Sequence, residues 1–344
     1  MNALVKTVPG AGAQYLQVDI PMIKDDEVLV KVKASALCKS DVDVYEWTPV
    51  VQNLKLPLPK IMGHEFLGEV VETGGKVKGI NVGDHIAGET HIPCGQCNCC
   101  KTGNPHICNN GMGVLGRSTD GAFAEYIKLP ALCAIKIDNS IPVEHGAIME
   151  PLATALHALS KAGVSGKSVA ILGCGTIGLM AVELARFLGA TWIFAVSTSQ
   201  FKLDKALKLG ADFCINNKTE DMVQIIMEKT HGLGVDVAVE LTGNEGVINN
   251  VVKIMKPAGK IVFVGMIDYP LTFNNYMLGV VYKELVLTGI FGRRIFDTWE
   301  MLNAILETKR LNLEEYIGER LPLKDYEKAI KLSHSTAGRV ILIP

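Results

Sequence analysis

Two patterns of apolar and polar positions divide the chain. Up to about residue 147, apolar residues alternate with polar ones or form short β-branched runs broken by Gly and Pro, as at 27–36 (EVLVKVKASA) and 66–74 (FLGEVVETG). Alternation with a period of two is typical of strands that bury one face. The N-terminal part is therefore predicted to be β-rich.

The pattern changes between Lys167 and Gly289. A short apolar run at 168–172 (SVAIL) precedes a stretch of helical spacing at 179–190 (LMAVELARFLGA), and further apolar runs follow at 192–197, 213–216, 235–241, 260–266 and 284–290. Strands that alternate with helices predict a parallel sheet with right-handed crossovers, which is an α/β fold.

Domain boundaries follow from the same change of pattern. The tail ends in one more strand-like run, 338–344 (GRVILIP), which is expected to return to the first domain. We predict a β-rich domain from 1–147 and 290–344, in which residues 90–110 form a small lobe. A doubly wound domain is predicted at 148–289.

Composition narrows the possible partners and the compartment. The 344 residues carry a net charge of -2, and the basic residues are scattered, so neither nucleic acid nor a membrane is an expected partner. The N-terminus lacks the pattern of a signal peptide, and the longest uncharged apolar run, 168–182, is too short to span a bilayer. A cytoplasmic location is expected, where clustered cysteines are more often metal ligands than disulfides.

Four of the nine cysteines have the spacing of a metal site. They are Cys94, Cys97, Cys100 and Cys108, in a loop rich in Gly and Asn. Four thiolates can surround one tetrahedral zinc and leave no open position, so the site would be structural. The alternative is an iron–sulfur cluster, although the last spacing of seven residues differs from the three residues and Pro of bacterial ferredoxins.

A glycine-rich motif follows the strand predicted at 168–172. It runs through Gly173, Cys174, Gly175, Thr176, Ile177 and Gly178. Between a strand and a helix, the first glycine allows a tight turn, the second lets the backbone approach a pyrophosphate, and the third allows close packing of helix and strand. The motif predicts a dinucleotide site, and Thr242, Gly265 and Arg293 are further candidate cofactor contacts.

The end of the next strand bears on which dinucleotide is bound. An NAD site usually has an Asp or Glu there for the ribose 2′-hydroxyl, but this chain has Ser197, followed by Thr198, Ser199 and, after two more residues, Lys202. Hydroxyls and a lysine suit a 2′-phosphate, so NADP is predicted in preference to NAD. The alternative is an NAD site in which these residues only cap a helix and meet solvent.

With these motifs the whole chain resembles the zinc-dependent medium-chain dehydrogenases. The resemblance lies in GHE-x2-G-x5-G at 63–74, in Gly83 and Asp84, and in the four-cysteine lobe that follows. It implies a GroES-like catalytic domain and a Rossmann cofactor domain. It also implies a second, catalytic zinc held by Cys38, His64, Glu65 and Glu150, not all of which bind at once. Such an open site stabilises an alkoxide and orients its C–H bond toward the cofactor.

Within this family the chain is most similar to the threonine 3-dehydrogenase branch. The similar stretches are VYEWTP at 44–49, ETHIPCGQC at 89–97, STDGAFAEY at 118–126 and GIFGRRIFDTW at 289–299. The resemblance implies that His91 lies near the substrate, that Ser40 passes the alcohol proton outward, and that the enzyme is a homotetramer.

Two positions depart from the branch. Asp43 stands where a histidine usually continues the proton relay, and it either replaces that base or merely caps the following turn. Lys39 replaces a small residue, as in alcohol dehydrogenases whose basic residue here meets the pyrophosphate.

Three functions stay open at this point. The first is oxidation of a secondary alcohol with a neighbouring polar group, L-threonine being the leading substrate. The second is oxidation of a polyol or a simple secondary alcohol. The third is a non-catalytic relative that has kept only the fold. A protein of that kind would have no physical need for the four predicted ligands of the catalytic zinc.

Overall fold

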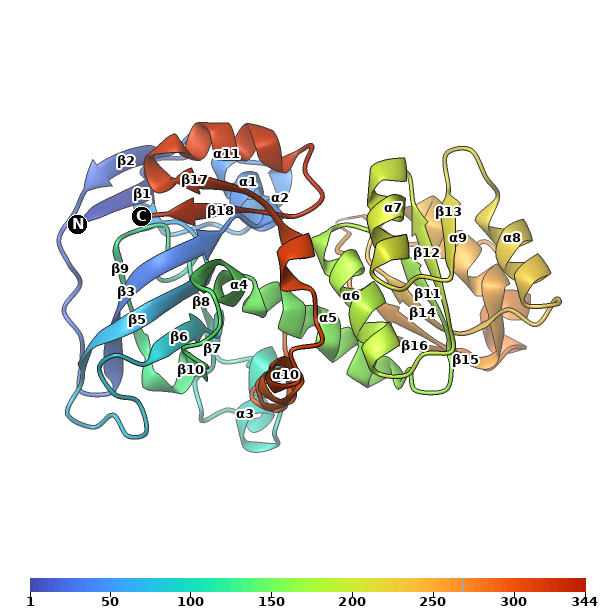
Figure 1. Cartoon of the computed structure of the whole chain (residues 1–344), viewed down its shortest axis with the longest axis horizontal. Helices are drawn as coiled ribbons and strands as arrows, with labels where there is room; N and C mark the ends of the chain where they lie inside the picture. The colour runs from blue at the N-terminus through green and yellow to red at the C-terminus, as the bar shows by residue number, and fades with distance from the viewer. Residues whose placement is uncertain (268) are drawn as a thin grey trace. The chain divides into compact units, whose positions relative to one another are not determined.

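A computed structural model describes residues 1–267 and 269–344, and it divides the chain into two compact units. Unit 1 comprises residues 1–151, 294–307 and 313–344, and unit 2 comprises residues 152–293 and 308–312. Figure 1 labels the elements of both. No helix among the described residues has both the length and the apolar character that a membrane span requires.

Unit 1 is β-rich, as the alternating pattern predicts. Its strands are β1 (Asn2–Lys6), β2 (Gln14–Gln17), β3 (Glu27–Ala36), β4 (Lys60–Ile61), β5 (Glu65–Thr73), β6 (His85–Gly88), β7 (His91–Ile92), β8 (Gly113–Val114), β9 (Tyr126–Pro130), β10 (Ala134–Ile137), β17 (Ile317–Pro322) and β18 (Arg339–Ile343). Its helices are α1 (Lys39–Glu46), α2 (Pro49–Asn53), α3 (Asn98–Lys101), α4 (Val143–Ala147), α10 (Asp297–Glu307) and α11 (Tyr326–Ser333).

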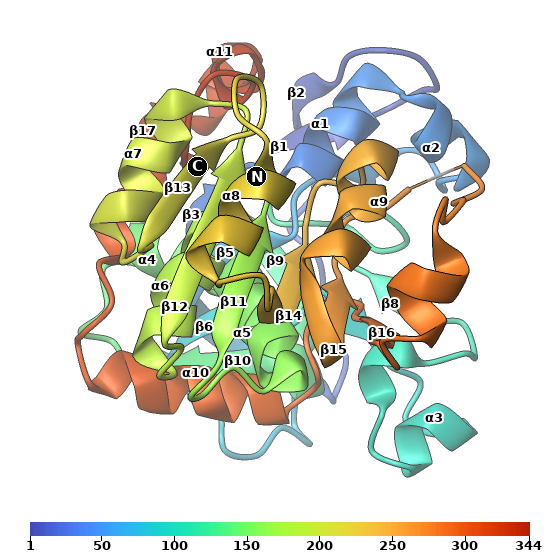
Figure 2. The same cartoon turned by 90° about the vertical axis from the view of Figure 1, so that its right-hand side faces the viewer.

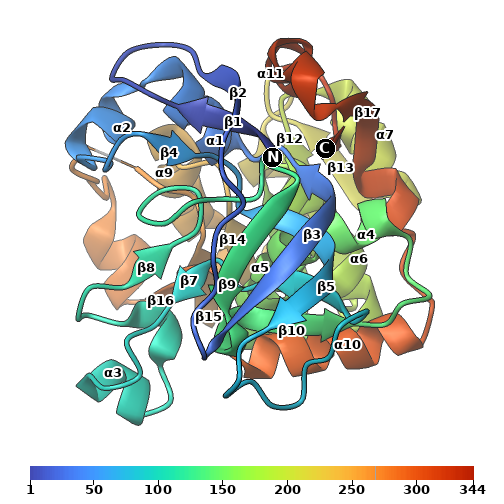
Figure 3. The ribbon, with the colours of Figure 1, turned by 90° about the vertical axis from the view of Figure 1, so that its left-hand side faces the viewer.

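The main sheet of unit 1 is built around β3 (Figure 3). The strand order is β10-β6-β5-β3-β18-β17, and β9 also pairs with β3. Val28, Val30 and Val32 of β3 face a buried apolar cluster, whereas Lys31 is exposed, which is the alternation expected of a strand with one core face. The C-terminal strand β18 pairs antiparallel with β3, so the end of the chain returns to the N-terminal sheet.

Unit 2 contains a six-stranded parallel sheet with helices on both faces. Its strands are β11 (Ser168–Leu172), β12 (Trp192–Ser197), β13 (Phe213–Asn216), β14 (Val235–Glu240), β15 (Met255–Phe263) and β16 (Val286–Gly289). Its α-helices are α6 (Thr176–Phe187), α7 (Gln200–Lys208), α8 (Met222–Lys229) and α9 (Glu245–Ile254), and α5 (Met149–Ala162) begins in unit 1 and continues into unit 2.

The strand order of this sheet is β13-β12-β11-β14-β15-β16 (Figure 2). In Figure 1, α6 and α7 cover one face and α8 and α9 the other. The chain leaves β11 toward β12 on one side and later enters β14 on the other, so the crossovers diverge beside the carboxyl end of β11. In a doubly wound sheet this switch point is where ligands bind. The predicted α/β fold class is confirmed.

Candidate active site and metal centres

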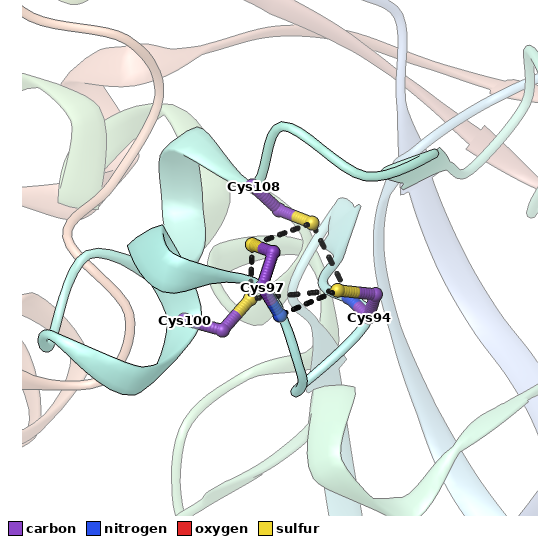
Figure 4. A group of neighbouring side chains, drawn as sticks. All are labelled: Cys94, Cys97, Cys100 and Cys108. Atoms are coloured by element: carbon purple, nitrogen blue, oxygen red, sulfur yellow. Dashed lines mark hydrogen bonds between the residues drawn. The ribbon is translucent and has the colours of Figure 1, made fainter.

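The four cysteines of the 90–110 lobe converge on one point (Figure 4). Their sulfurs lie within 4.8 Å of one another, with Cys97 to Cys100 at 3.5 Å, Cys97 to Cys108 at 3.8 Å and Cys94 to Cys100 at 4.0 Å. Sulfurs placed about 2.3 Å from a tetrahedral zinc are roughly 3.8 Å apart, so the group fits one zinc ion.

Backbone N–H groups of the lobe point at these sulfurs. The amides of Gln96 and Cys97 donate to Cys94 Sγ at 3.4 and 3.3 Å, and the amide of Cys94 donates to Cys108 Sγ at 3.4 Å. The backbone amide of Cys100, against the effect of burial, lowers the pKa of the Cys97 thiol to about 6. Such hydrogen bonds stabilise thiolates, which are the form that binds metal.

A second group combines Cys38, His64 and Glu65, whose ligand atoms also lie within 4.8 Å of one another. Cys38 stands between β3 and α1, and the other two residues stand at the start of β5. Because β3 and β5 pair antiparallel with Ala36 opposite Glu65, the sheet register brings the three side chains to one edge. Thiolate, imidazole and carboxylate are all donors that zinc accepts.

The turn before β5 depends on a glycine. Gly63 has φ of +90°, and a Cβ built on it would lie 2.4 Å from the ring of Phe123. Only glycine tolerates both this conformation and this close approach, so Gly63 fixes the direction in which His64 leaves the turn.

Two charged residues absent from the predictions surround this group. Asp41 Oδ1 lies 3.1 Å from His64 Nδ1, and its Oδ2 accepts a hydrogen bond from the Cys38 amide. Arg339 of β18 donates two hydrogen bonds to the Glu65 carboxylate, at 2.7 and 2.8 Å, and a third to Cys38 Sγ at 3.6 Å. With Nδ1 turned to Asp41, His64 has its Nε2 available for a metal.

The electrostatics of the group follow from burial and these neighbours. Burial alone would raise the pKa of the Cys38 thiol, but Arg339 and His64 bring it down to about 6. Burial raises the pKa of Glu65 well above its usual range, and Arg339 opposes the shift. Burial would lower the pKa of His64, but the Asp41 carboxylate raises it well above its usual value.

Glu150 stands beside this group without belonging to it. It lies in the first turn of α5, and its Oε1 accepts a hydrogen bond of 3.1 Å from Thr90 Oγ1. The same hydroxyl lies 3.4 Å from the backbone oxygen of His64, and the charge of Glu150 contributes to the raised pKa of Glu65. Thr90 therefore links β7 to the candidate metal ligands.

His91 follows Thr90 on β7 and is buried. Its ring Nδ1 lies 3.4 Å from Glu89 Oε1, and its backbone amide donates to the same oxygen at 2.9 Å. The other oxygen of Glu89 accepts a hydrogen bond of 2.7 Å from Trp299 Nε1. Glu89 and Trp299 lie inside two stretches that carry the family resemblance, but their pairing had no signal in the sequence.

The predicted proton route lies on α1. Ser40 and Asp43 are three residues apart in this helix, which places them on neighbouring turns of one face. Lys39 Nζ donates to Asp43 Oδ1 at 2.7 Å and forms an (i, i+4) ion pair with it. The Asp43 backbone oxygen also accepts the amide of Trp47 at the end of the helix.

In unit 2 the glycine motif forms the turn between β11 and α6. Gly173 has φ of +106°, and a Cβ on Gly178 would lie 1.9 Å from the Gly173 oxygen, so both positions require glycine. A Cβ on Gly175 would meet nothing within 4 Å among the described residues. The open side at Gly175 and the start of α6 at Thr176 fit a pyrophosphate held by helix amides.

The residues predicted to meet the 2′-position follow β12. The amide of Ser199 donates to Ser197 Oγ at 3.3 Å, and Ser199 is the first residue before α7. Burial raises the pKa of the Cys174 thiol to about 12, and the ammonium of Lys202 is close enough to oppose that shift. Lys202 therefore lies near the glycine turn.

Thr242 and Gly265 lie at the same end of the sheet as the glycine turn. A Cβ on Gly173 would lie 2.9 Å from Thr242 Cγ2, and one on Gly265 would lie 2.4 Å from the Gly243 amide nitrogen. Glu240, fully buried at the end of β14, accepts hydrogen bonds from the Thr242 amide and hydroxyl and from the Gly243 amide. Glu240 thus shapes this loop, which the sequence did not indicate.

Arg293 is the last of the predicted cofactor contacts. It is buried, and its guanidinium donates to Thr154 Oγ1 of α5 at 3.4 Å. Its assignment to the cofactor stays a prediction.

Comparison with known proteins identifies the family. A family model described as alcohol dehydrogenase GroES-like domain matches residues 24–139, and one described as zinc-binding dehydrogenase matches residues 176–308. The chain is 42% identical to L-threonine 3-dehydrogenase of Caldanaerobacter subterraneus, with 100% of this chain and 99% of the relative covered. It is 39% identical to L-threonine 3-dehydrogenase of Pyrococcus horikoshii, with 100% and 98% covered.

A solved structure agrees with these relatives. A zinc-binding dehydrogenase from Sinorhizobium meliloti, bound to NADP, superposes with a TM-score of 0.90 at 30% identity, covering 100% of this chain and 99% of that one. The expected resemblance and the expected enzyme class are confirmed. The chain belongs to the zinc-dependent medium-chain dehydrogenases, which are alcohol oxidoreductases that use a nicotinamide cofactor.

Proposed function

We propose that this enzyme oxidises L-threonine at its secondary hydroxyl group, with NADP as the preferred hydride acceptor and with one catalytic and one structural zinc in each chain. The observation that carries the proposal is the Cys38, His64 and Glu65 group with Glu150 near it, in a chain whose full-length relatives are L-threonine 3-dehydrogenases.

The two zinc sites have different roles in this proposal. Cys94, Cys97, Cys100 and Cys108 supply four thiolates, so their metal has no position for a substrate and holds the lobe together. Cys38, His64 and Glu65 supply three ligands and leave room for a fourth, with Glu150 beside them. When bound there, zinc supplies Lewis-acid polarisation of the alcohol.

The residues of unit 1 orient the substrate and move its proton. Asp41 holds the His64 ring, and Arg339 holds the Glu65 carboxylate. Ser40 receives the alcohol proton, and Asp43, one helical turn away, accepts it at the outer end. His91 contacts the amino or carboxylate group of the amino acid substrate.

The residues of unit 2 bind the cofactor. The amides at the start of α6 meet the pyrophosphate, and Gly173, Gly175 and Gly178 allow its close approach. Ser197, Thr198, Ser199 and Lys202 bind the 2′-phosphate, and no carboxylate stands at the end of β12 to repel it. The NADP in the Sinorhizobium meliloti structure belongs to a relative of the same fold and supports this preference.

We also propose that the enzyme assembles as a homotetramer through β16, among other contacts. Among the described strands this last strand of the sheet pairs only with β15, and exposed apolar side chains precede it and occupy it. They are Tyr276, Met277, Leu278, Val281, Tyr282 and Val286. An open strand edge beside an apolar patch is a surface that association covers.

A panel of alcohols tests the proposed function. L-Threonine, a polyol such as sorbitol, 2,3-butanediol and 2-butanol are each offered with NADP and with NAD, and reduced cofactor is measured together with zinc content. The highest kcat/KM is expected for L-threonine with NADP. A higher kcat/KM for sorbitol or 2-butanol would assign the site to another alcohol. If no alcohol were turned over, the hypothesis of a non-catalytic, cofactor-binding relative would be favoured.

A further inference from the structure

The carboxylate of Glu89 is fully buried next to β7. Its Oε2 accepts the indole N–H of Trp299 at 2.7 Å, and its Oε1 accepts the His91 amide at 2.9 Å. Oε1 also lies 3.4 Å from His91 Nδ1. One carboxylate thus touches both the backbone and the ring of the histidine assigned to the substrate.

Placing a carboxylate there costs stability. Taking a charged oxygen pair out of water costs several kcal/mol before hydrogen bonds offset it, and an apolar residue of similar size would often be as stable. A buried carboxylate with two well-formed hydrogen bonds therefore fits a role in orientation better than a role in core stability.

The consequence for the His91 ring follows from its chemistry. A ring whose Nδ1 faces a carboxylate carries its proton on Nδ1, and Nε2 then points to the opposite side of the ring. The preceding residue, Thr90, donates to Glu150 Oε1 and lies beside the His64 backbone. His91 is thus joined through the chain to a residue that contacts Glu150 and the His64 backbone.

Trp299 connects this arrangement to a distant part of the chain. It lies in the first turn of α10, has 1% of its surface exposed, and is 210 residues from Glu89 in sequence. Two of the stretches that resemble the threonine 3-dehydrogenase branch, 89–97 and 289–299, therefore meet at this hydrogen bond.

We propose that Glu89 and Trp299 are positioning residues that fix the ring of His91, so that its Nε2 selects an alcohol with a polar group beside the hydroxyl. The inference rests on the proposed function in that His91 contacts the substrate. It adds two residues that act only through His91.

Two conservative variants test the proposal. Trp299→Phe removes the indole N–H and keeps an aromatic ring, and Glu89→Gln keeps an acceptor for the indole while weakening the hold on His91. Each is expected to lower kcat/KM for L-threonine by about ten- to a hundred-fold, mainly through KM, while kcat/KM for 2-butanol, which has no polar group for His91, changes by less than about two-fold. Thermal unfolding and zinc content are measured alongside to verify that the variants fold.

Matched controls make the same substitutions away from the site. Trp192→Phe alters a half-exposed tryptophan of β12, and Glu125→Gln alters a carboxylate that accepts hydrogen bonds from Asn2. Neither control is expected to change the ratio of the two kcat/KM values.

The decisive comparison repeats both changes in a His91→Ala background. If Glu89 and Trp299 act through His91, their effects on L-threonine vanish there, because residues that act as a unit are not additive. An unchanged substrate ratio in both single variants, or an equal loss with and without His91, would overturn the proposal. If the wild-type enzyme prefers another alcohol, the same cycle of variants is measured with that alcohol. Failure of the threonine assignment can then be distinguished from failure of the positioning proposal.

Discussion

The two cysteine-containing groups of unit 1 are built in opposite ways. The four cysteines at 94–108 come from one short lobe, and their hydrogen-bond donors include backbone amides of the same lobe. Cys38 follows β3, whereas His64 and Glu65 stand at the start of β5. Charged side chains from other elements hold them: Asp41 from α1 and Arg339 from β18.

In the proposed function, this difference separates a structural zinc from a catalytic zinc. Four thiolates from a local segment need no other side chains and leave no open position. Three unlike ligands with buried charged neighbours form only when the whole unit is folded, and those neighbours orient each ligand.

Loss of the Cys38, His64 and Glu65 metal site should abolish activity and leave the fold intact. Cys38→Ser is expected to lower kcat by about a thousand-fold or more, since metal polarisation of the alcohol is worth several kcal/mol. Zinc should fall from two to one per chain, with little change in the unfolding temperature. Retention of both zinc ions together with full activity would show that Cys38 is not a ligand.

Removing the closed site should have the opposite effect. Cys97→Ser is expected to destabilise the lobe, which loses its metal and with it a large share of its folding free energy, by about 3 kcal/mol or more. Thermal unfolding and zinc analysis measure the loss, and Cys99→Ser, in the same lobe but outside the metal group, is the matched control. Equal unfolding temperatures in the two variants would contradict a structural zinc.

The charged surroundings of the open site should tune its affinity for zinc. Asp41→Asn keeps the shape of the side chain but loses the carboxylate beside His64, and we expect zinc to bind there about ten- to a hundred-fold more weakly. Competition with a chelator measures the affinity. Asp120→Asn is the control, because the contacts described for Asp120 are with the Ile61 amide of β4 and with Lys60, and none is with the metal group.

A change in unit 2 should leave both metal groups intact. Ser197→Asp places a carboxylate at the end of β12, where it accepts the ribose 2′-hydroxyl of NAD and repels a 2′-phosphate. The preference for NADP should shift toward NAD by about ten-fold, or ~1.4 kcal/mol, with both zinc ions retained. A wild-type enzyme with higher kcat/KM for NAD would give the hydroxyl cluster another role.

The smallest effect concerns the proton. Asp43→Asn removes a base but keeps the size of the side chain, so kcat should fall by less than about ten-fold and its pH profile should change shape. Lys39→Met is the companion variant, since it breaks the same ion pair while it keeps the carboxylate. An unchanged kcat–pH profile in Asp43→Asn would exclude the relay and leave Asp43 as a helix residue paired with Lys39.

The sequence revealed the features that are local or periodic. The strand at 168–172, the glycine turn and the four-cysteine spacing are each contained in a few residues, and each could be predicted from physical rules. The partners of these residues could not. Arg339 lies 274 residues from Glu65, and Trp299 lies 210 residues from Glu89, so only the folded chain brings them together.

Asp41 is an intermediate case. It follows Cys38 by three residues, as expected of a residue in the first helical turn that bonds the preceding amide. Its second contact, with His64, depends on the pairing of β3 with β5 and could not be predicted from that spacing. Lys39 differs, because its (i, i+4) ion pair with Asp43 is local to α1 and follows from helical spacing.

Graded removal of zinc tests the contrast between the two groups most directly. The purified enzyme is treated with increasing chelator, and zinc per chain, activity and unfolding temperature are followed together. Activity is expected to disappear as the first zinc leaves, while the second stays bound and the unfolding temperature falls only when it is lost at higher chelator. Loss of both metals in one step, or iron with acid-labile sulfide in place of zinc, would contradict two zinc sites of different character.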